Sequence, residues 1–270
     1  MKVLHIITSL GSGGAEGMLY RLIKATNESV EHTVICINNG GKYVSFLRNA
    51  GIEVLVLNFK FFYFIRAIRQ ILKFSRSKKN QGYLVITSWL LHADLISWFI
   101  KYLCGYKSLV WNIRNSKLQV RRSSFKNWSL LKILALLSHF DIDKIITNSN
   151  SAREIHKKIG YKNDNFLIIP NGYFVDAKKK FSKKKKDYNG IYKICIVARW
   201  SNQKDFENLF QALSLLLSSN VCFHLTIAGN NTGPDNYKLN KMLNKYKIIK
   251  YYSIIGEVDN VDDIYMNSHV

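Results

Sequence analysis

The chain has 270 residues, of which 40 are basic and 18 acidic, so its formal net charge is +22, and 47% of its residues are hydrophobic. That hydrophobic content excludes a disordered chain, and two prolines with fifteen glycines exclude collagen-like and proline-rich architectures. Because domains commonly hold about 100 to 200 residues, the length predicts two α/β domains.

The cysteines and the apolar segments indicate a cytoplasmic chain without a membrane-spanning helix. The apolar run 3–10 leads into Gly11 rather than a cleavage site, so it is interpreted as a first strand and not as a signal peptide. The most apolar long window, 83–104, contains His92, Asp94 and Lys101, each costly at a bilayer centre. No cysteine or histidine spacing predicts a metal site. Four cysteines far apart among apolar neighbours are interpreted as reduced core residues: Cys36, Cys104, Cys195 and Cys222.

Short β-rich apolar runs alternate with longer helical patterns along the first 172 residues, which predicts βα units around a mostly parallel sheet. Helices are expected between the strands, and the turn at 170–172 ends this pattern. The expected strands are Lys2–Thr8, His32–Ile37, Ile52–Leu57, Tyr83–Thr87, Ser108–Asn112, Lys144–Thr147 and Asn165–Ile169.

A lysine-rich segment separates this series from a second one. The second series has strands expected at Ile191–Ala198, Phe223–Ala228 and Tyr251–Ile255, with helices at Phe206–Leu217 and Tyr237–Tyr246. A doubly wound domain commonly needs about five or six strands, so the second domain is expected to be incomplete. The predicted organisation is an N-terminal Rossmann-like domain at 1–172, a basic linker at 173–190 and a partial C-terminal domain at 191–270.

A glycine-rich turn with the sequence Gly11–Ser12–Gly13–Gly14–Ala15–Glu16–Gly17 joins the first expected strand to the first helix. The backbone N–H groups and the helix dipole at such a turn favour an anionic ligand. The pattern departs from G-x-G-x-x-G at Glu16, so a nicotinamide dinucleotide site is disfavoured. The alternative interpretation is that the glycines only permit a tight turn.

Two cations follow the first strand of the second series. Arg199 and Lys204 are five residues apart on a loop before a helix, so both can converge on one diphosphate. Solvated surface charge is the alternative. Gly229 and Gly256 each end a later strand, at the edge where open α/β sheets bind ligands. Two sheets with ligand-facing edges predict a cleft between them.

Six motifs, in their order along the chain, resemble glycosyltransferase family 4, and together they span nearly its whole length. They are Ile7–Glu16, Thr87–Leu95, Val110–Ser116, Asn148–Ser149, Ile169–Gly172 and Val197–Leu209. The resemblance implies a GT-B fold, two Rossmann-like domains facing a cleft, and a retaining hexosyltransferase-type enzyme with a UDP- or GDP-sugar as donor. It implies a saccharide or polyprenyl-linked acceptor on the N-terminal domain. The implied pathway is biosynthesis of a cell-surface polysaccharide such as capsule, O-antigen or exopolysaccharide.

The resemblance also implies roles for individual residues. Arg199 and Lys204 match the cationic pair that holds the donor diphosphate, and Gly13 and Gly14 match the glycine loop near the phosphates. His92 matches the N-terminal active-site histidine, with a packed helix-start residue as the alternative. No cofactor or metal is expected, because cations and helix N-termini offset the charge on the leaving diphosphate. Further cleft candidates are Glu16, Arg114, Asn171, Gly172, Gly229 and Gly256.

One part of the family pattern does not occur in the sequence. Family members continue past the segment that ends at Val270 into a turn and two glutamates eight residues apart, which bind the donor. The sequence therefore also predicts an alternative, a truncated and catalytically inactive remnant that retains acceptor or membrane binding.

The segment 59–74 combines large apolar residues with four cations and no acid, as interfacial helices do. A second basic patch has Lys117, Arg121, Arg122 and Lys126 with Trp128. Both predict peripheral binding to anionic lipid at the inner face of the membrane, with core packing alone as the alternative for 59–74. Under that alternative, six positions with helical spacing would face the core: Phe61, Phe64, Ile65, Ile68, Ile71 and Leu72. Four others can reach headgroups: Phe62, Arg66, Arg69 and Lys73.

The net charge also raises the question of nucleic acid as a partner. Lysine and arginine neutralise phosphates, yet no helix-turn-helix, zinc finger or RNP-like strand occurs in the sequence. The cations are spread over the chain and pooled in the linker, as solvated charge is. Specific nucleic-acid binding is therefore not expected.

Overall fold

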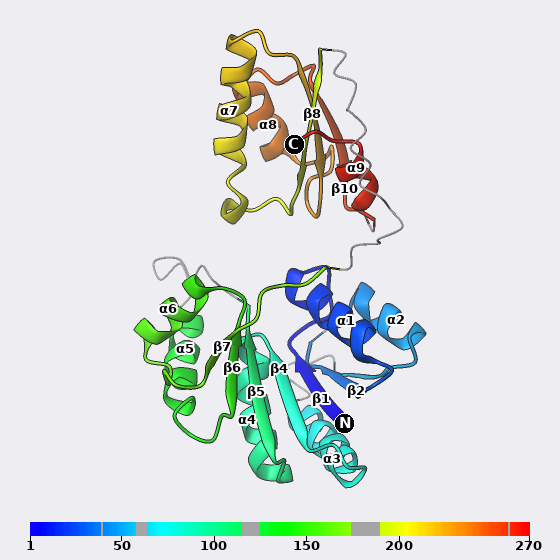
Figure 1. The fold of residues 1–270 in the computed structure, drawn as a ribbon, viewed down its shortest axis with the longest axis vertical. Coiled ribbons are helices and arrows are strands. Elements are labelled where there is room, and N and C mark those ends of the chain that lie inside the picture. Colours follow the sequence, from blue (N-terminus) through cyan, green and yellow to red (C-terminus); the bar gives the residue numbers. More distant parts are fainter. Residues whose placement is uncertain (39, 58–63, 115–124, 174–189, 259) are drawn as a thin grey trace. The chain divides into compact units, whose positions relative to one another are not determined.

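The chain folds into two compact units, residues 1–174 and 175–270, which are described separately (Figure 1). The computed structural model describes residues 1–38, 40–57, 64–114, 125–173, 190–258 and 260–270. The predicted linker lies outside the described residues except at its two ends, 173 and 190. Of the second basic patch, only the Trp128 side chain is described.

The first unit is built on a seven-stranded parallel sheet in the order β3-β2-β1-β4-β5-β6-β7. All the strands expected here are confirmed, with ends that shift by up to two residues. The order reverses between β1 and β4, which is the switch point where open α/β sheets bind ligands. The strands are β1 (Lys2–Ile7), β2 (Glu31–Cys36), β3 (Glu53–Val56), β4 (Val85–Trp89), β5 (Ser108–Ile113), β6 (Lys144–Thr147) and β7 (Phe166–Ile168).

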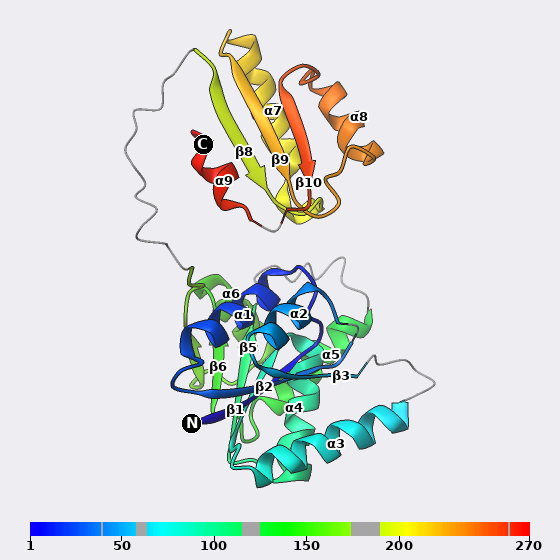
Figure 2. The ribbon, with the colours of Figure 1, turned by 90° about the vertical axis from the view of Figure 1, so that its right-hand side faces the viewer.

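Helices cover both faces of this sheet. On one face, α1 (Gly14–Thr26) and α2 (Lys42–Asn49) bury an apolar cluster that includes Leu19 and Leu47. On the other, a larger cluster includes Ile71, Ile100 and Leu134. Figure 2 shows α1 and α2 on one side of β1–β3 and α3 on the other. Each fully buried Leu or Ile contributes about 1.5–3 kcal/mol to stability, so these clusters hold the two layers of helices on the two faces of the sheet. The second layer contains α3 (Phe64–Asn80), α4 (Leu91–Cys104), α5 (Phe125–Leu137) and α6 (Asn150–Ile159).

Helix α3 packs on a different stripe from the one predicted. Ile65 is 66% exposed and Ile68 is 37% exposed, so the core-packing alternative is wrong at these two positions, whereas Ile71 of the same set is buried. The buried stripe has the same three- and four-residue spacing and shares Ile71 with the predicted one, but it runs through Ala67 and not through Ile65 and Ile68. The predictions for Phe61, Phe62 and Phe64 fall outside the described side chains. The buried positions of α3 are Ala67, Ile71, Ser75 and Lys78.

The second unit has a three-stranded parallel sheet in the order β10-β9-β8. The predicted strands and both predicted helices are confirmed. Helices α7 and α8 pack on one face through a cluster that includes Phe210, Leu225 and Leu243. The elements are β8 (Tyr192–Val197), the short turn η2 (Asn202–Lys204), α7 (Phe206–Ser218), β9 (Phe223–Ala228), α8 (Tyr237–Lys245), β10 (Tyr252–Gly256) and α9 (Asp262–Met266).

The cysteines differ in burial. Cys36 and Cys104 are buried, whereas Cys195 is half-buried and Cys222 is exposed. The prediction of a core position is therefore wrong for Cys222, because it precedes β9 and its side chain faces solvent.

Candidate functional site

The carboxyl ends of the strands collect the predicted site residues of the first unit. In a parallel sheet all these ends lie at one edge, so loops far apart in sequence become neighbours. The sites are the loop after β1 with Gly13, Gly14 and Glu16, the start of α4 with His92, the end of β5 with Arg114, and the segment after β7 with Asn171 and Gly172.

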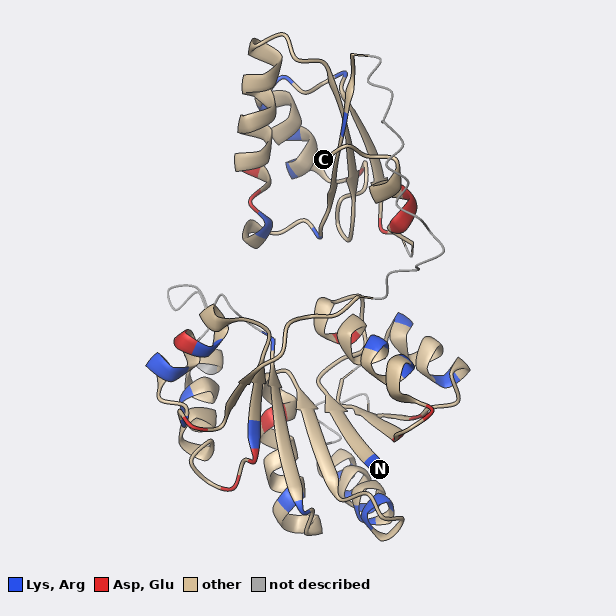
Figure 3. Cartoon of the chain, viewed as in Figure 1, with Lys and Arg blue, Asp and Glu red and all other residues tan. Residues whose placement is uncertain are grey.

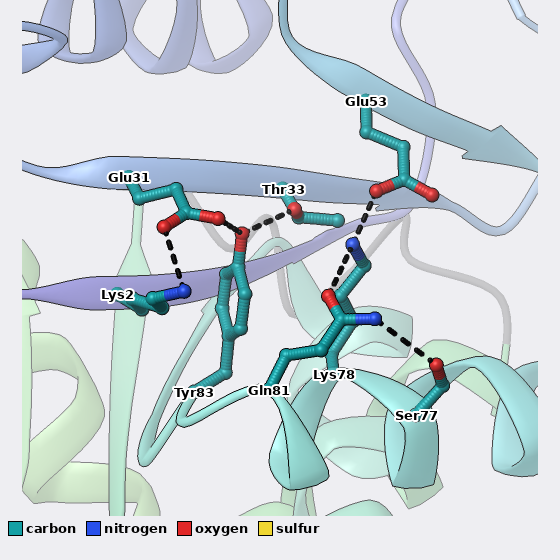
Figure 4. Close-up of polar contacts among 8 residues, drawn as sticks. All are labelled: Lys2, Glu31, Thr33, Glu53, Ser77, Lys78, Gln81 and Tyr83. Atoms are coloured by element: carbon teal, nitrogen blue, oxygen red, sulfur yellow. Dashed lines mark hydrogen bonds and ion pairs between the residues drawn. The ribbon is translucent and has the colours of Figure 1, made fainter.

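The opposite edge carries charges that neutralise one another (Figure 4). Lys2 Nζ lies 2.9 Å from Glu31 Oε2, and the Tyr83 hydroxyl donates to Glu31 Oε1 at 3.0 Å. The ammonium of Lys78, which is buried, pairs with the carboxylate of Glu53. Lys2, Glu31 and Glu53 thus begin β1, β2 and β3, and their ion pairs join the amino ends of these strands to one another and to Lys78 of the helix 64–80. This edge of the sheet has a structural role.

Arg114 is a firmly held cation at the carboxyl edge. Its Nη1 donates to Asn171 Oδ1 at 2.9 Å and its Nη2 to Asn112 Oδ1 at 3.4 Å. Its guanidinium carbon lies 5.0 Å from the centroid of the Trp89 ring, within the range of cation–π attraction. Burial lowers the Arg114 pKa, yet arginine remains charged at neutral pH. The structure thus brings together two predicted cleft candidates, Arg114 and Asn171.

A second arginine holds the same segment from α1. Arg21 Nε donates to the Gly172 carbonyl at 3.2 Å, and its guanidinium carbon lies 4.5 Å from the centroid of the Tyr173 ring. Two guanidinium groups therefore contact the adjacent residues 171 and 172. Arg21 was not predicted from the sequence, because a lone arginine inside a helix pattern is usually solvated.

The N-terminus of α1 already holds a carboxylate. Glu16 is buried, accepts a 3.0 Å hydrogen bond from Ser9 Oγ, and lies against Gly13 so closely that a side chain at position 13 would collide with it. A carboxylate at the third helical position offsets the positive end of the helix dipole. An anionic ligand at Gly13 or Gly14 would meet this charge, so the donor-binding role of both glycines stays a prediction.

The turn into α4 is strained and presents His92. Leu90 has a φ of 76°, which is unfavourable for a residue with a branched side chain. His92 is exposed and has no hydrogen-bond partner in the part of the chain that the structure describes. It is therefore an accessible imidazole at the switch point rather than a packed residue, and its catalytic role stays a prediction.

Asp94, two residues further on, is a buried acid that anchors α4 to β4. Its Oδ1 accepts a 2.6 Å hydrogen bond from Ser88 Oγ, while its Oδ2 is buried without a partner. Burial raises the pKa of Asp94 to about 8, against a weaker opposing effect of the Ser88 bond. Asp94 is thus a neutral acid at pH 7, which the sequence did not predict.

Trp89, which supports Arg114, ends a chain of buried hydrogen bonds. Trp89 Nε1 donates to His5 Nδ1 at 3.4 Å, and His5 Nε2 lies 2.9 Å from His32 Nδ1. His32 Nε2 lies 2.9 Å from Thr26 Oγ1, which donates to the Leu22 carbonyl at 2.8 Å. Indole N–H only donates and a carbonyl only accepts, so the two ends fix the direction. Both histidines are neutral, each with its proton on Nε2.

The second unit gathers its predicted residues at one edge as well. Gly229 N donates to the Gly256 carbonyl at 2.7 Å, and Trp200 N donates to the Asn230 carbonyl at 2.8 Å. Gly229 has a φ of 137° and lies against the Ala198 carbonyl, where any side chain would collide. The loop that carries Arg199 therefore lies beside the ends of β9 and β10.

Arg199 and Lys204 are exposed on this loop. Arg199 Nη2 donates to the neutral Gln203 Oε1 at 3.2 Å, and neither cation forms an ion pair with a residue that the structure describes. An unpaired arginine and lysine on one loop can both reach a diphosphate.

The described residues contain neither a metal-binding cluster nor a helix that could span a membrane. No group of three or more histidine, cysteine, aspartate or glutamate residues in these ranges is arranged to hold a metal ion. Within the same ranges, no helix combines the length and apolar character needed to cross a membrane.

Comparison with known proteins gives consistent matches. Residues 12–176 match the family described as Glycosyltransferase Family 4, and residues 177–270 match Glycosyl transferases group 1. The chain is 26% identical over 266 residues to the capsular polysaccharide biosynthesis glycosyltransferase CapH of Staphylococcus aureus, covering 96% of this chain and 71% of CapH.

Solved structures share the fold. The Anabaena HepE structure in complex with UDP and glucose has a TM-score of 0.76 at 16% identity, covering 99% of this chain and 72% of HepE. The lipopolysaccharide outer core galactosyltransferase WaaB has a TM-score of 0.65 at 16% identity, with the same coverages of 99% and 72%. These likenesses show that the α/β fold with parallel sheets, predicted from the sequence, is the GT-B fold.

Proposed function

Because the chain belongs to glycosyltransferase family 4, we propose that it is a retaining hexosyltransferase that uses a UDP- or GDP-sugar. The observation that carries this proposal is the unpaired Arg199 and Lys204 pair at the carboxyl edge of the second sheet. Such cations stabilise the charge that develops on a leaving diphosphate, so no metal or other cofactor is needed. The complex of the similar HepE with UDP and glucose supports a nucleotide-sugar donor.

The proposed acceptor is a saccharide or a lipid-linked saccharide of a cell-surface polysaccharide. The similarity to CapH, a capsular polysaccharide enzyme, supports this pathway. In the proposal the first unit, 1–174, binds the acceptor, and the exposed imidazole of His92 is its catalytic candidate. The second unit binds the donor through Arg199 and Lys204.

Changing these residues is expected to separate donor binding from transfer. Arg199→Ala and Lys204→Ala should each weaken UDP binding by about tenfold or more, because each removes a charge-assisted contact of about 1.5–3 kcal/mol. His92→Ala should leave UDP affinity unchanged and lower the rate of nucleotide release. Calorimetric titration with UDP and GDP, together with chromatographic detection of nucleotide diphosphate released from UDP- and GDP-sugars, measures both effects.

The matched control is Lys241→Ala, an exposed lysine of α8 in the same unit. If Lys241→Ala weakened UDP binding as much as Lys204→Ala, general surface charge and not a site would explain the affinity. If neither nucleotide bound to the wild-type chain, the donor proposal would be wrong.

We also propose that the first unit docks on an anionic membrane surface through α3. The exposed Ile65 and Ile68 lie among the basic residues of this helix, which Figure 3 marks in blue. Apolar side chains can enter the headgroup region while Arg66, Arg69 and Lys73 meet anionic lipids. A peripheral position would bring the chain to a lipid-linked acceptor.

Vesicle flotation tests this docking. The chain is expected to float with vesicles containing phosphatidylglycerol and much less with pure phosphatidylcholine vesicles. The double change Ile65→Ser with Ile68→Ser should reduce flotation without changing the charge. Equal flotation with both kinds of vesicle would contradict the proposal.

A further inference from the structure

We propose that Arg114, Asn171 and Arg21 form a phosphate-binding subsite at the carboxyl edge of the first sheet. The site itself is argued from the contacts of these residues, whereas its occupation by a phosphate group of the acceptor rests on the proposed function.

Arg114 is held in place by neutral groups. Two asparagine oxygens accept from its Nη1 and Nη2, and the Trp89 ring lies under its guanidinium. Trp89 is itself held by its indole N–H bond to His5, so its ring cannot rotate freely. A cation whose position is fixed before a ligand arrives loses little conformational entropy on binding.

Arg114 has no acidic counter-charge among the described residues. A guanidinium has five N–H donors, and Arg114 uses two of them in contacts to the described residues. Its Nε is buried and has no partner, and no acidic side chain in the described ranges contributes to its pKa shift. Buried charges without a partner are costly, so a preorganised unpaired cation at a ligand edge is typical of an anion site.

A second guanidinium contacts the same segment. Arg21 contacts Gly172 while Arg114 contacts the adjacent Asn171, and the structure shows no acid paired with either in the ranges it describes. The contrast with the loop after β1 is direct, because there Glu16 already occupies the N-terminus of α1. Within the first unit, an anion is therefore favoured at segment 171–172 over the glycine loop.

Phosphate is the anion that fits this arrangement best. Arginine forks bind phosphate oxygens in pairs, and two forks can hold one tetrahedral group from two sides. Two sources can supply the group, a lipid-linked acceptor or free phosphate. They share the same recognition chemistry and differ in the chain attached to it.

The test uses the full chain labelled with 5-fluorotryptophan, because Trp89 lies directly under Arg114. Its fluorine resonance among the five tryptophans is assigned from Trp89→Phe. Geranyl phosphate and inorganic phosphate are titrated in the presence of saturating UDP, with geraniol as the uncharged control. Both phosphates are expected to shift the Trp89 resonance in a saturable way, and geraniol is not. Tighter binding of geranyl phosphate assigns the group to a lipid-linked acceptor, and equal binding assigns it to phosphate alone.

Substitutions then locate the binding. Arg114→Gln should weaken phosphate binding at least tenfold, Arg114→Lys and Arg21→Gln by less, and Arg76→Gln on the exposed side of α3 should have no effect. An unchanged affinity in Arg114→Gln, or an equal shift with geraniol, overturns the subsite. A tenfold loss of UDP affinity in Arg114→Gln also overturns it, because the arginine would then belong to the donor. Retained UDP binding with lost phosphate binding supports the subsite even if no transfer is detected.

Discussion

Between pH 4 and pH 9, the difference in the free energy of unfolding between Asp94→Asn and the wild type is expected to change by about 6 kcal/mol in favour of the variant. The carboxyl has a pKa of about 8 in the folded chain, against 3.8 for an ordinary aspartate, because it is fully buried. Between pH 4 and pH 8 the folded state therefore holds one more proton than the unfolded state, and at pH 9 the carboxyl is ionised in both states. By linkage, the wild type loses stability as the pH rises through the window from 4 to 8, and asparagine does not titrate.

The sign of the effect differs at the two ends of the range. At pH 9 the wild type must bury an ionised carboxylate whose Oδ2 has no partner, so Asp94→Asn should be more stable. At pH 4 the wild type has a neutral acid that accepts from Ser88 and carries a single O–H donor, whereas the amide brings two N–H donors to the position of the partnerless Oδ2, at a further cost of about 1–3 kcal/mol. The variant should therefore be the less stable chain in acid and the more stable one in alkali.

Urea unfolding followed by tryptophan fluorescence measures this difference, because four of the five tryptophans lie in the first unit. Asp164→Asn is the matched control, since Asp164 is an exposed acid of the same unit. The free energy of unfolding of Asp164→Asn should differ from that of the wild type by a constant amount across the pH range. A constant difference between Asp94→Asn and the wild type would show that Asp94 is ionised in the folded state and would contradict the burial argument.

Much of the fold could be predicted, because it depends on short-range patterns. Apolar runs of four to eight residues separated by helical patterns predicted the strands of both sheets, and the βα order fixed which loops share an edge. The phase of α3 could not be predicted in the same way. Its sequence has apolar residues on two stripes, and the choice of Ala67 over Ile65 depends on how closely the helix approaches the sheet.

The candidate site was predicted to a lesser extent. The positions of His92, Arg114 and Arg199 near the carboxyl ends of strands followed from the resemblance and the strand order. The surroundings of these residues could not be predicted, because they depend on the register of neighbouring strands. Lys2 pairs with Glu31 in the parallel ladder, which brings His5 and His32 onto neighbouring strands two positions apart. A histidine inside an apolar run is a weak signal alone, and only the register shows that two of them meet.

Replacing His5 with phenylalanine is expected to lower the free energy of unfolding. His5 makes the wild type less stable in acid, whereas Asp94 makes it less stable in alkali. Burial, together with repulsion by His32, lowers the pKa of His5 from 6.5 to about 3. The folded wild type therefore binds fewer protons than the unfolded chain between these values. The contribution of His5 to the free energy of unfolding is therefore fully present above about pH 6.5, and it falls by about 5 kcal/mol in all as the pH decreases toward 3. Burial also lowers the pKa of His32, which adds to the loss.

At pH 7.5, His5→Phe should be less stable than the wild type by about 2–4 kcal/mol, because the Trp89 N–H and His32 Nδ1 both lose their partner. At pH 4.5 the difference should be smaller by about 3 kcal/mol. The wild type loses this stability because His5 takes up a proton in the unfolded chain, whereas the phenylalanine of the variant does not titrate. His139→Phe, at an exposed histidine of the same unit, is the control and should keep a constant difference from the wild type. Urea unfolding at both pH values measures the change.

The same variant links the hydrogen-bond chain to the proposed phosphate subsite. Without His5, the Trp89 ring loses the contact that fixes it under Arg114, so the guanidinium should be less well ordered. Geranyl phosphate binding should then weaken in His5→Phe at pH 7.5, although position 5 lies in a strand and not at the ligand edge. Unchanged phosphate affinity in a folded His5→Phe chain would show that Asn112 and Asn171 alone position Arg114, and that the histidine pair serves stability only.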